Sequence, residues 1–130
     1  MVEYKSGSET VQAEKIIEKV VDVISERDYS KISTIVDELN NWSISLISEI
    51  VENFIEDNNL ERFDPYKTPC KFKPKYEYKQ LNFYKWDDGR GMSCEYDFTT
   101  NGDLNDLTLM IDFYYEGNML KSIFQDLHVM

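Results

Sequence analysis

The sequence lacks any apolar run near the roughly 18 residues that a membrane-spanning helix needs. Its first ten residues contain Glu3 and Glu9 and no apolar stretch, so we expect no secretory signal there. Together these absences predict a cytoplasmic protein that makes no membrane contact.

Residues for metal and nucleophilic chemistry are scarce. His128 is the only histidine, Cys70 and Cys94 stand 24 positions apart, and there is no Cys-x-x-Cys pair. No serine lies in a nucleophile elbow, and Gly89-Arg-Gly91 lacks the strand-to-helix setting of a phosphate loop. We therefore expect free thiols, no metal, no cofactor and no enzymatic activity.

Proline is also rare, and its placement divides the chain. All three prolines fall between Pro65 and Pro74, where they prevent a central strand. The 130 residues are the size of one domain. We predict a helical part over 1–60 with 1–9 frayed, a crossing segment over 61–75 and an antiparallel sheet over 76–130.

Apolar residues recur at helical spacing in the first part. A first helix is predicted from Glu9 or Thr10 to Arg27-Asp28, and a short second one after Asp28 or Ser30 carries Ile32 to Leu39. The third begins at Ser43 and ends at Asp57-Asn-Asn59.

The later part alternates with the period of strands. Four strands are predicted over 76–86, 92–100, 107–116 and 119–129, joined by turns at Asp87–Gly91, Asn101–Asp103 and Gly117-Asn118. Leu127 and Val129 are expected to point inward. The predicted fold class is α+β, with three N-terminal helices packed on a curved four-stranded antiparallel meander.

Acidic residues outnumber basic ones, and the net charge is −11. Such a chain repels phosphate backbones, so we expect no nucleic-acid partner, whereas a basic protein is steered toward it. The alternative is that the charge only keeps the protein soluble. One stretch is basic, because residues 67–85 hold six lysines and one glutamate.

Aromatic residues are the stronger lead to a binding surface, because tyrosine and tryptophan often anchor protein interfaces. Tyr84, Trp86 and Tyr114 lie in predicted strands. The alternative is that such aromatics fill the core and that the neighbouring lysines guard an edge strand. With selected carboxylates, the candidate partner-binding residues are Glu49, Glu52, Glu56, Tyr84, Trp86, Asp97, Asp112 and Tyr114.

The last third of the chain resembles a family of small uncharacterised bacterial proteins. The resemblance rests on a Thr-x-x-Gly turn leading into Asp-Leu-Thr and on a closing Asp-Leu-His-Val strand. The matching positions are Thr99, Gly102, Asp106, Leu107, Thr108, Asp126, Leu127, His128 and Val129. Those proteins look like relatives of the cystatin-like or nuclear-transport-factor-like group, and some resemble immunity proteins encoded beside secreted toxins.

The leading hypothesis is therefore a non-enzymatic protein-binding module, an immunity-type protein that neutralises a basic toxin. The alternative is a small-molecule-binding or isomerase/dehydratase-like protein of the nuclear-transport-factor-like type. In that case a pocket under the sheet would use Asp97 or Asp112 as a base, with His128 nearby. Association into a homodimer through the sheet is left open.

Overall fold

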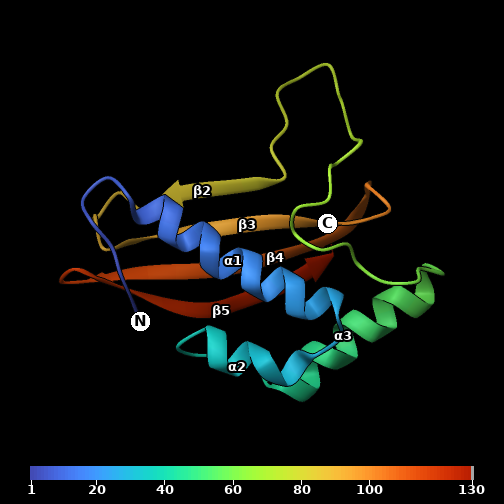
Figure 1. Cartoon of the computed structure of the whole chain (residues 1–130), viewed down its shortest axis with the longest axis horizontal. Coiled ribbons are helices and arrows are strands. Elements are labelled where there is room, and N and C mark those ends of the chain that lie inside the picture. Colours follow the sequence, from blue (N-terminus) through green and yellow to red (C-terminus); the bar gives the residue numbers. More distant parts are fainter. Residues whose placement is uncertain (130) are drawn as a thin grey trace.

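The computed structural model describes residues 1–129. It is an α+β fold in which helices and strands are segregated along the chain (Figure 1). A single antiparallel sheet has the order β1-β5-β4-β3-β2, so β2 to β5 form a meander and β1 adds at its end. The strands are β1 (Val2–Glu3), β2 (Leu81–Lys85), β3 (Gly91–Thr100), β4 (Asp103–Glu116) and β5 (Met119–Val129).

The two long helices confirm the helical spacing of the sequence. Helix α1 (Glu9–Ser25) crosses one face of the sheet, with its apolar stripe buried (Figure 1). Helix α3 (Ile44–Asp57) begins at Ser43, whose Oγ accepts a hydrogen bond from the Leu46 N–H at 3.0 Å. Each helix buries one stripe of apolar side chains, as amphipathic helices do when they cover a core.

The second helix is shorter than predicted. It consists of a 3₁₀ turn, η1 (Tyr29–Lys31), followed by α2 (Ile32–Ile35). Val36 then adopts extended backbone, because Asp37 and Glu38 bond to β5 and do not continue the helix. The N–H groups of both residues donate to the Ser122 carbonyl, and the Phe124 N–H donates to the Glu38 carbonyl at 2.9 Å.

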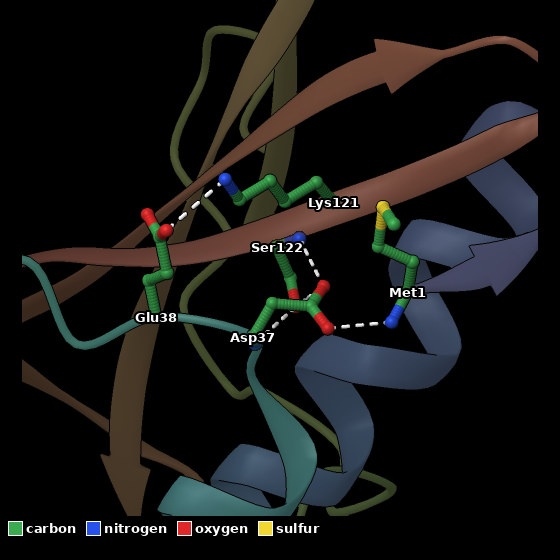
Figure 2. A network of polar contacts seen from close by, with 5 residues as sticks. All are labelled: Met1, Asp37, Glu38, Lys121 and Ser122. Atoms are coloured by element: carbon green, nitrogen blue, oxygen red, sulfur yellow. Dashed lines mark hydrogen bonds and ion pairs between the residues drawn. The ribbon is translucent and has the colours of Figure 1, made fainter.

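Side chains reinforce this junction (Figure 2). The Asp37 carboxylate accepts a hydrogen bond from the Ser122 N–H at 2.8 Å and also contacts the amino group of Met1. Beside it, Lys121 Nζ lies 3.0 Å from Glu38 Oε1. The segment after α2 is thereby fastened to β5 by backbone and side chain together.

The first residues differ from the frayed segment expected over 1–9. Val2 pairs with Leu120 and Glu3 pairs with Met119, which forms strand β1. The sheet therefore has five strands and not the predicted four.

Strand β2 begins at Leu81 and not at Tyr76, because β3 has another neighbour past Asp97. The Asp64 N–H donates to the Thr99 carbonyl at 2.8 Å. The buried Asp64 carboxylate then accepts hydrogen bonds from Thr99 Oγ1 and from the N–H groups of Asn101 and Gly102. This part of the β3 edge is therefore unavailable to residues 76–79. The Asn101–Gly102 turn is as predicted, with both φ angles positive.

The sheet has two different faces. Pairing across β2 to β5 aligns apolar residues toward the helices, and there they are buried. Cys94 is buried in this core and Cys70 is half-buried, and both are free thiols. Leu127 is buried as expected. Val129 lies on the helix-facing side opposite Leu107 but is 64% exposed at the end of the strand, so the burial predicted for it is wrong. Within residues 1–129, no helix has the length and apolar character to cross a membrane.

Candidate functional site

The candidate site is the sheet face that points away from the helices, here called the open face. Its residues follow from the strand register, because cross-strand partners share a face. The apolar residues of this face stay outside the core that the helices form with the other face. The open face carries Asn82, Tyr84, Ser93, Glu95, Asp97, Thr108, Met110, Asp112, Tyr114, Lys121, Ile123, Asp126 and His128, with Trp86 lying over it.

One row across this face contains Tyr84, Ser93 and Asp112 as direct neighbours. Trp86 Nε1 donates a hydrogen bond to Ser93 Oγ at 3.1 Å, and Ser93 Oγ donates to Asp112 Oδ1 at 2.7 Å. These two hydrogen bonds form a relay from Trp86 through Ser93 to Asp112, and the relay fixes the orientation of the Asp112 carboxylate. Tyr84 stays 51% exposed beside it, so an aromatic ring on the surface adjoins an oriented acid.

Glycine at position 91 allows the Trp86 ring to lie on the sheet. A Cβ atom on Gly91 would stand 2.9 Å from Trp86 Cζ3, so the indole occupies the place of a side chain. On its other side the indole contacts Tyr114 in a T-shaped arrangement, with ring centroids 4.8 Å apart. The two half-buried rings form an apolar wall next to Asp112.

Asp112 is 9% exposed, and one of its oxygens has a donor in Ser93. Oδ2 has no hydrogen-bond donor among residues 1–129 and keeps contact with solvent. Burial raises the pKa of this carboxyl, and the Ser93 hydrogen bond opposes the shift only in part. The charged carboxylate is therefore held in an unfavourable environment.

This arrangement predicts that Asp112→Asn stabilises the fold at neutral pH. A raised pKa in the folded state means that ionisation of Asp112 disfavours folding above its ordinary pKa of 3.8. Asparagine retains an oxygen acceptor for Ser93 without the charge. We expect a higher melting temperature for the variant at neutral pH, and a gain that shrinks as the pH falls through the raised pKa of Asp112 and is lost below 3.8. Thermal unfolding followed by circular dichroism across pH tests this, and an equal or lower melting temperature at neutral pH would contradict it.

The other carboxylates predicted in strands are already engaged. Asp97 accepts hydrogen bonds from Tyr78 Oη at 2.7 Å and from Thr108 Oγ1 at 2.7 Å, one on each oxygen. His128 Nδ1 lies 3.0 Å from Asp126 Oδ2 at the same end of the face. Asp97 therefore fastens the loop before β2 to the sheet and has no oxygen without a donor.

The three glutamates predicted on α3 belong to the helical layer and do not join the open face. Glu52 accepts hydrogen bonds from Arg27 Nε at 2.9 Å and Tyr29 Oη at 2.6 Å. Burial and this contact with Glu52 raise the pKa of Tyr29. Glu52 thus connects α3 to the segment after α1, while Glu49 and Glu56 are exposed.

A separate pocket of about 480 Å³ lies at one end of the sheet, on the helix-facing side. Glu9 and Lys85 form an ion pair there at 3.3 Å, and Glu9 Oε2 is buried without a donor among the described residues. Tyr4 and Tyr115 also line it, with ring centroids 5.6 Å apart. Across residues 1–129, no three histidine, cysteine or carboxylate side chains meet as a metal site would require.

The open face falls within a part of the chain that matches a family model. That model, described as a domain of unknown function (DUF7668), matches residues 21–130. The chain belongs to the DUF7668 family. Searches of curated proteins and of solved structures found no match. In this DUF7668 domain, β2 to β5 and α3 lie inside the matched region, whereas β1 and the first part of α1 precede it.

Sequence reasoning found the aromatic residues and Asp112 of the open face in this DUF7668 domain, but it missed Ser93 and Gly91. The alternation in β3 already places Ser93 on the same face as Glu95 and Asp97. Its contact with Asp112 depends on the register between β3 and β4, which the sequence pattern does not contain. Gly91 shows only a turn signal in the sequence, although its role is to receive the Trp86 ring.

Proposed function

We propose that this protein is a non-enzymatic binding module of the immunity type that neutralises a basic toxin by docking it on the open face. The observation that carries the proposal is the combination of Tyr84, Trp86 and Tyr114 with Asp112 on a sheet face that no described helix covers. Aromatic residues supply contact area at interfaces, and the net charge of −11 attracts a cationic partner.

We also propose that the fold belongs to the cystatin-like or nuclear-transport-factor-like group. An order of three helices followed by an antiparallel meander supports a cystatin-like or nuclear-transport-factor-like assignment. The family match by itself assigns no activity, so the docking role rests on the open face.

The small-molecule alternative needs a pocket between the helices and the sheet. Core side chains such as Cys94, Ile111 and Phe113 fill the helix-facing side, and all are 0% exposed. Asp97 and Asp112 point to the opposite face, and neither they nor His128 line the pocket beside Glu9. The geometry therefore favours docking of a protein over catalysis in a pocket.

The test is affinity capture from the native host with three forms of the protein. Tyr84→Ala/Glu95→Lys alters two accessible positions of the open face, and Glu49→Lys makes the same charge change on α3 as a matched control. We expect wild type and the α3 variant to retain a basic protein that is released as salt rises, and the open-face variant to lose it. Co-expression with wild type should relieve the toxicity of the captured protein.

Two results would count against this function. One is capture of the same proteins by all three forms, or of an acidic protein whose binding ignores salt. The other is recovery of no partner together with a neighbouring gene that encodes no toxin.

A further inference from the structure

One corner of the open face has the features of a site for a single cationic side chain. We call it the Asp112 notch, and it consists of Trp86, Ser93, Asp112 and Tyr114. Three elements supply these residues: the turn after β2, strand β3 and strand β4. They are joined by the relay from Trp86 through Ser93 to Asp112 and by the contact between the Trp86 and Tyr114 rings.

The notch holds its acid in a fixed position. Ser93 occupies Asp112 Oδ1, which leaves Oδ2 as the acceptor without a donor among the described residues. Trp86 in turn holds the Ser93 hydroxyl, so the carboxylate is oriented before any ligand arrives. A preoriented acceptor loses less freedom on binding than a flexible surface carboxylate does.

The surroundings of Asp112 also favour a positively charged ligand. A carboxylate removed from water at a sheet surface disfavours the fold unless a cation approaches it. Lys121 lies opposite Tyr114 on β5, one row of this face away from Asp112, and its ammonium is bound to Glu38. Arg90, at the turn before β3, is bound to Asp88. Both of these cations are thus paired with other carboxylates.

We propose, resting on the proposed function above, that the Asp112 notch receives one arginine side chain of the basic partner. The guanidinium donates to Asp112 Oδ2 and stacks on the aromatic wall of Trp86 and Tyr114. Arginine fits better than lysine, because its flat, weakly hydrated head group can donate a hydrogen bond and stack on an aromatic ring at once.

The test uses a probe in place of the partner. The probe is a capped Gly-Arg-Gly peptide, with the citrulline peptide as its neutral isostere and Gly-Lys-Gly as the second cation. Binding is followed by NMR at the indole N–H of Trp86, with Trp42→Phe used to assign it. We expect a saturable shift at Trp86 with the arginine peptide, a weaker one with lysine and none with citrulline.

Variants separate the notch from general attraction to an acidic surface. Asp112→Asn should weaken arginine binding by about tenfold or more, as expected for the loss of a hydrogen bond between charged groups. Ser93→Ala, which releases the relay, should weaken it less. Glu49→Gln removes one negative charge from the exposed surface of α3, outside the open face, and should bind as wild type does. Melting temperatures confirm that each variant is folded.

Every outcome of these peptide experiments either supports or overturns the arginine site at the Asp112 notch. An equal response to citrulline, equal losses in Asp112→Asn and Glu49→Gln, or lysine binding as tightly as arginine would overturn it. If the arginine peptide fails while Tyr84→Ala/Glu95→Lys still abolishes capture of a basic protein, only the notch is wrong. If both fail, the proposed function fails with it.

Discussion

A chain truncated after Ile123 is expected to lose its cooperative thermal transition altogether. The deletion removes Phe124 and Leu127, which are 0% and 5% exposed in the core. Loss of side chains of these kinds from a core costs about 3–5 and 2–5 kcal/mol, a large share of the roughly 5–15 kcal/mol that stabilises an ordinary domain. It also removes the Gln125 carbonyl that accepts a hydrogen bond from Trp42 Nε1 at 3.0 Å.

Circular dichroism and differential scanning calorimetry measure this loss. Phe124→Ala alone should lower the free energy of unfolding by about 3–5 kcal/mol, since Phe124 also contacts Trp42 edge to face. Val129→Ala is the matched control, because Val129 is 64% exposed and its loss should leave the transition nearly unchanged. A truncated protein that still melts cooperatively near the wild-type temperature would show that β5 is dispensable for the core.

Gly91→Ala is expected to destabilise the protein by about 3 kcal/mol, through steric overlap and not through backbone conformation. The added Cβ would lie 2.1 Å from the Phe113 carbonyl oxygen and 2.9 Å from Trp86 Cζ3. Since the Phe113 contact involves backbone in the adjacent strand, no rotamer change relieves it. The indole would also be displaced from Ser93, so the variant should lose the NMR response to the arginine peptide.

Gly117→Ala provides the comparison. Gly117 has a φ of +62° and no atom within 4 Å of the added Cβ, so only its backbone conformation opposes the change. That variant should lose about 1–2 kcal/mol and keep its arginine response. Urea denaturation measures both, and equal losses with an intact Trp86 signal in Gly91→Ala would disprove the steric explanation.

Local patterns in the sequence predicted much of the fold. The apolar stripes of α1 and α3 and the serine at position 43 each act within a few residues, and the structure confirms them. The bounds of β5 also agree with the prediction. The features that were missed depend on distant segments. Asp64 occupies the β3 edge and delays the start of β2, and Asp37 bonds to Ser122, which stops the second helix early.

In the candidate site, too, local features follow from the sequence pattern, whereas others depend on distant segments. Period-two alternation placed Ser93, Glu95, Asp97 and Thr99 on one face without knowledge of the fold. The first three lie there, whereas Thr99, past a register shift in β3, is buried. Whether that face is open or covered depends on where the helices pack, and the partner of each carboxylate depends on the register. Asp97 is engaged by Tyr78 and Thr108, whereas Asp112 keeps one oxygen without a donor. Two strand aspartates that look alike in the sequence therefore have different chemistry.

The order of elements along the chain has a consequence for biosynthesis. Helix α1 leaves the ribosome before the strands that bury its apolar side chains, and Val2 pairs with Leu120 only when nearly the whole domain has emerged. Ile17, Val20 and Ile24, all 0% exposed in the folded protein, lack the cover of the complete sheet until then. Because contacts between distant residues form late and slowly, the domain completes its fold only when nearly all of it has been synthesised. A nascent chain stalled before β5 should therefore be a chaperone substrate and sensitive to protease.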